Sequence, residues 1–296
     1  MASPRFLSEF EPRYGECVQV ARGIRRVVAR NPSKFTAWGT GTYLVGDGEL
    51  AVVDPGPDDA EHLAALLGAI GGRRVTHILV THTHADHSPA TAAIKEATGA
   101  LTYGFGPHPL AADELTEEHG DLDFSPDVAV GDGEVLSGSG FTFECLHTPG
   151  HISNHVCFAE TSRSCLFSGD HVMGWSTTVI SPPGGDVTDY LSSLARLLLR
   201  DDEVYYPTHG PPIVDPRRYV AELIEHRLHR EAQILEALQV EPATVEDLVA
   251  GIYAEVRVEL HEPAARSVLA HLLALEGDGR VGRVGCDDDG RWELLS

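Results

Sequence analysis

No other stretch limits the possible folds of this chain as strongly as residues 81–87, Thr-His-Thr-His-Ala-Asp-His. Four side chains that can bind metal, those of His82, His84, Asp86 and His87, fall within six residues. They directly follow the apolar run 75–80, which has the composition of a buried β-strand. Neutral imidazole and carboxylate are good ligands for zinc and similar divalent ions. The segment therefore predicts a metal site at the end of a strand.

The chain is strongly acidic. Its 22 lysine and arginine residues face 45 aspartates and glutamates, a formal net charge of −23, and its only lysines are Lys34 and Lys95. Such a surface opposes non-specific binding to nucleic acid and to anionic membranes. No stretch approaches the roughly 18 apolar residues of a membrane-spanning helix. We therefore expect no membrane partner, and we regard nucleic acid as a disfavoured partner.

The cysteines indicate a reducing environment. There are five of them without a CxxC pair, which argues against a disulfide framework and against a cysteine zinc site. The first residues lack the basic start and apolar run of a signal peptide. We therefore expect a cytoplasmic protein.

Alternating and apolar stretches predict a mixed α/β region over residues 1–215. Glycine-rich turns at 46–49 and 131–133 predict two β-hairpins, one joining strands 41–45 and 50–54, the other joining 128–130 and 134–136. The other predicted strands are 75–80, 101–103, 141–146, 155–159, 164–167 and 205–206, and the predicted helices are 58–70, 89–98 and 187–200.

The pattern changes after residue 215. Helices are predicted over 219–238, 244–253 and 262–275, followed by strands 280–284 and 291–295. Three helices and a two-stranded hairpin are the outline of a small winged-helix domain, which we assign to 216–296. Residues 217–296 contain 9 basic against 16 acidic side chains, whereas a DNA-recognition helix should be basic. We expect this domain to pack on the region formed by residues 1–215, wall its pocket or form a homodimer.

Three further candidate metal ligands follow predicted strands, and each is next to a glycine in the sequence. His151 follows strand 141–146 through a Pro-Gly turn, Asp170 follows strand 164–167, and His209 follows strand 205–206. Loops at the mouth of a sheet are where chemistry is usually carried. These three side chains can therefore complete the site that residues 82–87 begin.

Taken in order, these motifs resemble those of the metallo-β-lactamase superfamily, an αββα sandwich of the α/β (α+β) class, and the resemblance covers about residues 15–215. By that resemblance His82, His84 and His151 bind one metal ion. Asp86, His87 and His209 bind a second, Asp170 bridges the two, and Asp54 orients a ligand from behind.

The same resemblance implies hydrolysis. Two divalent ions hold a hydroxide that attacks a carbonyl or phosphoryl centre, with Asp86 orienting it or taking its proton. The oxygen-reducing di-iron members resemble one another in having glutamate where this chain has His84, so histidine here indicates hydrolysis. Zinc is the expected metal, and manganese and iron stay open.

The C-terminal part is similar to the winged-helix tail of the β-lactamase-like protein 2 family, whose animal members cut RNA. Three functions stay open: a hydrolase of small acyl substrates (thioester, ester, lactone or β-lactam), a single-stranded RNA endonuclease, and non-catalytic metal or ligand binding. We favour the first because of the predicted metal site together with the acidic surface. Loops 105–126 and 172–186 are expected to select the substrate. One departure from the family is Thr208, which stands where glycine is more usual.

The roles of three other histidines stay open at this stage: His147, His155 and His171. The last two follow a ligand motif and could face the pocket.

Overall fold

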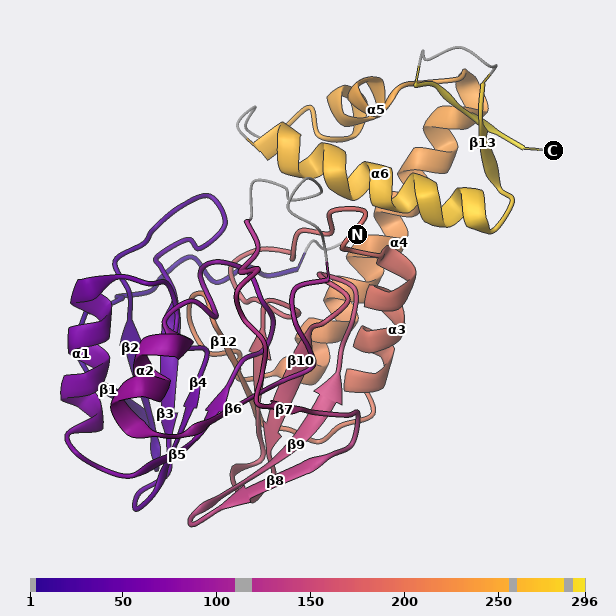
Figure 1. Cartoon of the computed structure of the whole chain (residues 1–296). Helices are drawn as coiled ribbons and strands as arrows, with labels where there is room; N and C mark the ends of the chain where they lie inside the picture. The colour runs from indigo at the N-terminus through magenta and orange to yellow at the C-terminus, as the bar shows by residue number, and fades with distance from the viewer. Residues whose placement is uncertain (1–3, 110–118, 256–259, 285–289, 296) are drawn as a thin grey trace.

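The computed structural model describes residues 4–109, 119–255, 260–284 and 290–295. Its larger part contains two β-sheets packed face to face (Figure 1). The first sheet has seven strands in chain order: β1 (Val18–Ala21), β2 (Ile24–Val28), β3 (Gly41–Val45), β4 (Leu50–Val53), β5 (Val75–Leu79), β6 (Leu101–Gly104) and β7 (Val128–Ala129). The second has five, in the spatial order β12 (Val204–Pro207), β11 (Cys165–Gly169), β10 (Val156–Glu160), β9 (Phe141–His147) and β8 (Val135–Gly138).

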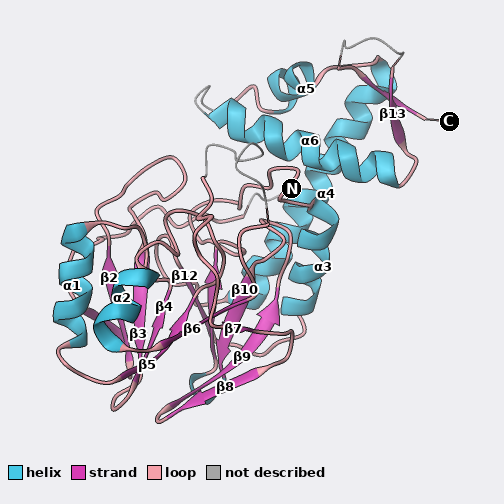
Figure 2. Cartoon of the chain, viewed as in Figure 1, coloured by secondary structure: helices cyan, strands magenta, loops and turns pink. Residues whose placement is uncertain are grey.

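Helices cover the outer faces of both sheets (Figure 2). On the first sheet lie α1 (Ala60–Ile70) and α2 (Thr91–Thr98), whose apolar side chains share a buried cluster with β4 and β5. On the second lie α3 (Val187–Leu197) and the start of α4 (Pro216–Val240). Between the sheets, a third cluster joins residues such as Tyr43 and Leu79 to Phe143 and Phe167. The predicted αββα sandwich is confirmed.

The predicted hairpin at 128–136 is wrong. Val128 pairs with Tyr103 of β6 in the first sheet, whereas Val135 pairs with Glu144 of β9 in the second. The Gly-Asp-Gly turn therefore carries the chain from one sheet to the other. The physical reason is burial, because Val130 and Leu136, on either side of the turn, both lie in the core between the sheets.

Strands β1 and β2 were not predicted, because two arginines interrupt the apolar pattern of β2. Arg26 is nevertheless 7% exposed, and its Nη1 donates to the carbonyl of Gly210 at 3.1 Å. A buried charge that donates to backbone can occupy a core strand, which composition alone does not reveal.

The smaller part consists of α5 (Val245–Ile252), α6 (His261–Gly277) and the strand pair β13 (Val281–Arg283) and β14 (Trp292–Leu294), together with the end of α4. Thr244 caps α5, in a capping box with Asp247. Helix α4 joins the two parts, because Val220 packs on the second sheet while Ile234 belongs to the C-terminal cluster. We keep the boundary at 215/216, where α4 begins, as a proposal. In the described part of the chain, none of the helices is long and apolar enough to cross a membrane.

Candidate metal centre

The structure brings all seven predicted ligand side chains together at one edge of the two sheets. They form three overlapping groups, and within each group one ligand atom per residue lies within 4.8 Å of the others. The groups are His82, His84 and His151; Asp86, His87 and His209; and His82, His87 and Asp170. Six of the seven side chains belong to buried residues, and Asp86 is partly exposed.

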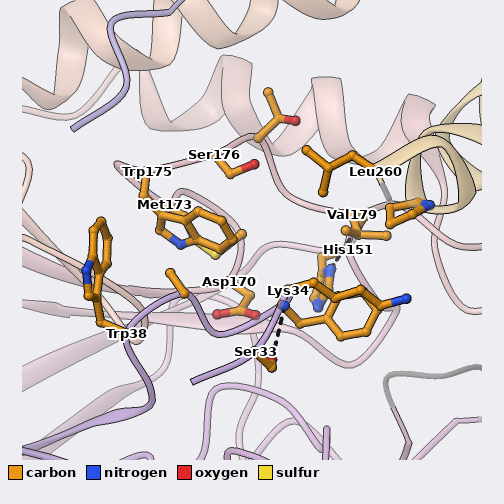
Figure 3. A pocket seen from close by; sticks show the side chains of 14 residues that line it. Ser33, Lys34, Trp38, His151, Asp170, Met173, Trp175, Ser176, Val179 and Leu260 are labelled. Carbon is orange, nitrogen blue, oxygen red and sulfur yellow. Dashed lines mark hydrogen bonds between the residues drawn. The ribbon is translucent and has the colours of Figure 1, made fainter. Parts of the chain in front are cut away.

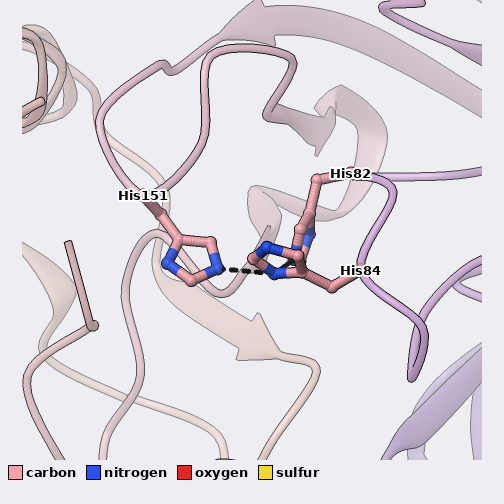
Figure 4. Close-up of side chains that lie close together, drawn as sticks. All are labelled: His82, His84 and His151. Atoms are coloured by element: carbon pink, nitrogen blue, oxygen red, sulfur yellow. Dashed lines mark hydrogen bonds between the residues drawn. The ribbon is translucent and has the colours of Figure 1, made fainter. Parts of the chain in front are cut away.

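The first group is a convergence of three imidazole nitrogens (Figure 4). Nδ1 of His84 lies 2.9 Å from Nε2 of His82 and 3.0 Å from Nε2 of His151. A neutral imidazole carries one N–H, so hydrogen bonding among three rings leaves lone pairs aimed at one another. A cation at that point satisfies all three nitrogens, so the first group fits a metal.

His151 is held from behind by loop 172–186. Its Nδ1 lies 2.6 Å from the carbonyl of Val179 and 3.2 Å from the hydroxyl of Thr178, which turns Nε2 toward the other two histidines. Arg227 of α4 in turn donates to the carbonyl of Thr178 at 2.5 Å. This buried arginine was not among the predicted site residues, since nothing in its local sequence links it to the metal motif.

The second group, Asp86, His87 and His209, combines imidazoles with a carboxylate, and the carboxylate of Asp170 lies beside it. Nε2 of His209 lies 3.1 Å from Oδ2 of Asp86 and 3.4 Å from Oδ1 of Asp170. Nε2 of His87 lies 3.6 and 3.5 Å from the same two oxygens. Despite this closeness, Nε2 of His87, Nε2 of His209 and Oδ1 of Asp170 are buried without a hydrogen bond of proper geometry. Buried polar atoms demand a partner, and a divalent ion among these atoms supplies one.

Asp54 supports the second group from below. Its carboxylate accepts from the backbone N–H and hydroxyl of Thr81, both at 2.8 Å, and lies 3.0 Å from Nδ1 of His87. The hydroxyl of Thr208 donates to it at 2.6 Å. Asp54 itself has a φ of 47°, a left-handed conformation that aspartate tolerates better than most residues. The unusual Thr208 is therefore a further donor to the carboxylate that orients His87.

The two groups differ in their protonation. Burial, followed by the surrounding imidazoles, holds the pKa of His82 well below its usual value. Burial also lowers the pKa of His209, but the carboxylates of Asp170 and Asp86 outweigh it and raise the pKa to about 10. For Asp86, burial raises the pKa, yet His87 and His209 outweigh burial and lower it to about 2. Burial therefore disfavours protonation of the His82 ring in the first group, whereas the neighbouring carboxylates favour protonation of the His209 ring in the second.

The contacts of His147, His155 and His171 differ from one another. Nε2 of His155 accepts from the backbone N–H of Asp170 at 3.3 Å, so His155 holds the backbone that carries Asp170. His171 packs against the Tyr190 ring at 4.8 Å, and neither of its nitrogens has a hydrogen-bond partner among the described residues. His147 stacks on Phe105 at 3.8 Å.

Glycine at position 169 is required by the crowding beneath Asp170. Its φ is 51°, and a Cβ atom there would lie 2.5 Å from Nε2 of His155 and 2.8 Å from Oγ1 of Thr81. No side chain fits without displacing the residues that hold the centre.

Two hollows open beside the centre. The larger, of about 460 Å³, includes His151 and Asp170 in its lining, and the smaller, of about 230 Å³, includes His84, Asp86 and Asp170. Asp170 lines both hollows. Of the predicted substrate-selecting loops, 172–186 contributes to the larger hollow, whereas residues 110–118 of the other loop lie outside the described residues.

The fold and this site define a class of protein. The family model described as the metallo-beta-lactamase superfamily matches residues 36–209, more than half of the chain, and the chain belongs to that superfamily. A second model, the beta-lactamase associated winged helix domain, matches residues 244–292. The predicted family and the predicted C-terminal winged helix are both confirmed.

Individual relatives extend over nearly the whole chain. An atrochrysone carboxyl ACP thioesterase of Aspergillus chevalieri is 31% identical over 91% of this chain and 86% of its own length. The lactamase-like protein adaB of Aspergillus niger is 28% identical over 95% of this chain and 89% of its own.

Among solved structures, a beta-lactamase domain protein from Burkholderia ambifaria has a TM-score of 0.80 at 22% identity, covering 97% of this chain and 96% of that one. A metallo-beta-lactamase family protein from Thermus thermophilus has a TM-score of 0.75 at 25% identity, covering 94% of this chain and 100% of that one. With the family and its thioesterase-named relatives, the prediction of an enzyme is confirmed, and the chain is a hydrolase of the metallo-β-lactamase fold.

Proposed function

We propose that this hydrolase uses two divalent metal ions to cleave small acyl substrates, thioesters above all. The observation that carries the proposal is that the group of His82, His87 and Asp170 overlaps both other ligand groups, sharing His82 with one and His87 with the other. A set of three nitrogens and a set of two nitrogens and a carboxylate, joined by a group that contains Asp170, suit a pair of ions better than one.

In this proposal His82, His84 and His151 hold the first ion, and Asp86, His87 and His209 hold the second. Asp170 lies between the two, and Asp54 fixes the ring of His87 from behind. Ions bound there supply an activated water and stabilise the negative charge that develops on the acyl oxygen. We propose zinc, because imidazole-rich sets with a few carboxylates suit it well.

We assign to Asp86 the transfer of a proton from the attacking water to the leaving group. Its side chain is 23% exposed, against 10% for Asp170, so it is the more open of the two carboxylates. Its carboxylate, 3.1 Å from Nε2 of His209, can accept a hydrogen bond from the attacking water. It also lines the smaller hollow, where a leaving group can receive the proton.

Thioesters come first among the acyl substrates because of the relatives. Proteins named atrochrysone carboxyl ACP thioesterases match this chain at 30–31% identity over 91–92% of its length. An activated water attacks esters, lactones and β-lactams by the same chemistry, so we expect weaker activity on those.

Single-stranded RNA is the weaker candidate. Binding it requires a cationic groove along the strand. Among the described residues that line the two hollows, Lys34 is the one lysine or arginine, and it is paired with Glu262 at 3.5 Å. The formal charge of −23 opposes the polyanion further.

A cytoplasmic location remains part of the proposal. The described cysteines are free thiols, and burial raises the pKa of Cys145, Cys157 and Cys165 to about 12. Such thiols are poor nucleophiles and suit a reducing compartment. The predicted homodimer stays a prediction that sedimentation would test.

The proposal is tested by assaying the zinc-loaded chain on a chromogenic thioester, a chromogenic β-lactam and a fluorogenic RNA. We expect thioester turnover that is lost in His84→Ala and kept in His147→Ala, a control histidine that stacks on Phe105. RNA cleavage that disappears in His84→Ala, without turnover of either acyl substrate, would overturn the choice of substrate. Metal binding without turnover of any of the three would overturn the catalytic proposal.

A further inference from the structure

The larger hollow is built jointly by the two parts of the chain. Loop 33–38 forms one wall, residues 173–179 form a second, and the start of α6 contributes Leu260 and Pro263 (Figure 3). Pockets of roughly 300–1,000 Å³ accommodate drug-sized ligands, so 460 Å³ is far more room than an acetyl group needs. The C-terminal domain thus closes the pocket that leads to the metal centre.

The walls of this hollow are largely apolar and aromatic. Phe35, Trp38 and Trp175 line it together with Met173 and aliphatic side chains. Aromatic walls favour aromatic ligands, because ring–ring contacts add to the stabilisation that comes from burying apolar area. A large acyl group with a ring therefore matches the chemistry of the walls.

The two indoles are positioned by the backbone that carries a metal-ligand candidate. Gly210, next to His209, has a φ of 87°, and a Cβ atom there would lie 3.1 Å from Trp175 and 3.4 Å from Trp38. Both rings therefore pack directly on this glycine. The aromatic wall and the second ligand group are thereby held in a fixed relation.

Contacts across the hollow fix α6 relative to loop 33–38. Nζ of Lys34 lies 3.5 Å from the carboxylate of Glu262 on α6 and 5.0 Å from the centre of the Phe35 ring. Exposed ion pairs contribute little to stability, so this pair aligns the wall more than it stabilises the fold. Arg227, bonded to the Thr178 carbonyl, fixes the opposite wall.

The lining of the smaller hollow is more polar than that of the larger one. Its lining includes the polar side chains of Asn31, Thr36, Asp86 and His119. Since Asp170 lines both hollows, a substrate whose reactive carbonyl lies there places one end in each. The apolar end, the acyl group, fits the larger hollow, and the polar leaving group fits the smaller one.

We propose that the hollow between the domains is an acyl pocket that selects thioesters of aromatic acids, and that the start of α6 sets its size. This inference rests on the proposed thioesterase function. In the reaction, water adds to the acyl carbon, the carbon–sulfur bond breaks, and a carboxylate, a thiol and one proton are released. Trp38, Trp175 and Leu260 are then specificity-determining residues.

The test compares kcat/KM for the acetyl, benzoyl and 2-naphthoyl thioesters of N-acetylcysteamine, with the full-length, zinc-loaded chain. We expect the wild type to prefer the aromatic substrates by about 10-fold or more. Leu260→Trp fills the pocket from α6 and should lower the naphthoyl-to-acetyl ratio at least about tenfold. Leu199→Trp adds the same indole at a position that is 85% exposed, and should leave the ratio unchanged.

A second variant keeps the test decisive if Leu260→Trp fails to fold. Trp175→Ala removes an aromatic wall and should raise KM for the aromatic thioesters more than for the acetyl one. Turnover of all three thioesters without aromatic preference would overturn the acyl pocket and leave the proposed function standing. An unchanged ratio in both folded variants would also overturn it. Turnover of no thioester at all would overturn the proposed function itself, and the acyl pocket with it.

Discussion

Buried histidines cluster at the edge of the two sheets, whereas His271 is buried by itself between α4 and α6, and only the first place has the character of a metal site. At the edge of the sheets, imidazole nitrogens of His84 and His151 approach within 3.0 Å of each other, and carboxylates stand close by. Between α4 and α6, His271 is 2% exposed, yet both its ring nitrogens lack a hydrogen-bond partner among the described residues. Its titratable neighbours on α4 are His226 and Arg227, and the positive charge of Arg227 repels a cation.

The comparison of these two places shows that a buried histidine does not by itself indicate a metal site. Burial lowers the pKa in both regions, for His82 as for His271. What distinguishes the sheet edge is the convergence of lone pairs from several elements together with negative charge. The interface histidine instead acts as an apolar ring whose protonation is costly.

Replacing the shared carboxylate should have the largest effect. Asp170→Ala removes the one side chain common to both proposed metal positions, so we expect the loss of at least one ion and a fall in kcat of about 10³-fold or more. Metal analysis and thioester turnover measure the two effects. Asp132→Ala is a matched control at an exposed carboxylate. Full two-ion occupancy in Asp170→Ala would refute the bridging role.

Replacing Asp54, which supports the second ligand group, should lower metal binding less than replacing a ligand does. Asp54→Asn keeps the shape of the side chain but removes the charge that faces Nδ1 of His87. We expect metal affinity to fall about 10–100-fold, as is typical for groups that orient a ligand. Competition with a fluorescent chelator measures it, and Asp201→Asn, at a 98% exposed carboxylate, is the control. Unchanged affinity would show that Asp54 only maintains the fold.

For His271, between α4 and α6, we expect the free energy of unfolding to depend on pH, and we expect no effect on metal binding. Burial, then Arg227 and His226, lower the pKa of His271 to about 3, against about 6.5 in the unfolded chain. The unfolded state therefore binds more protons between these values, and stability is lost as the pH falls below about 6.5.

His271→Leu should remove this dependence, which amounts to about 3 kcal/mol of unfolding free energy between pH 6.5 and pH 4. Urea unfolding across that range measures it, with His229→Leu as the control. Zinc content should not change in His271→Leu. A loss of metal in that variant would break the distinction between the two regions.

The smallest effect is expected at Thr208. Thr208→Val removes one of the hydrogen bonds to Asp54 while keeping the size of the side chain. We expect a loss of about 1 kcal/mol in stability, with two ions still bound. Thr208→Ser keeps the hydroxyl and should restore the wild-type value. Equal melting temperatures for all three proteins would show that the hydroxyl contributes nothing.

Much of the site was predictable because its ligands stand in short motifs at strand ends. Residues 82–87 follow β5, and Asp170 and His209 follow β11 and β12, so their convergence required only the expected sandwich. Asp54 was predicted from the family pattern, and the structure shows the hydrogen bonds that explain its position.

Contacts between distant elements were not predictable from local pattern. Arg227 lies 49 residues from Thr178 and reaches it only because α4 packs against the second sheet. The Gly-Asp-Gly turn at 131–133 predicted a hairpin. The same kind of turn can also carry the chain from one sheet to the other, which is what it does here. The acyl pocket depends on α6 meeting loop 33–38, a contact set by packing of the two domains.

The central claim, two metal positions that share Asp170, is tested most directly by counting the bound ions. The full-length chain would be loaded with zinc, freed of excess ion by gel filtration at neutral pH, and analysed by mass spectrometry under non-denaturing conditions. Two zinc ions per chain in the wild type, and one or none in Asp170→Ala, are predicted. A wild type that retains a single ion under saturating zinc would contradict the claim.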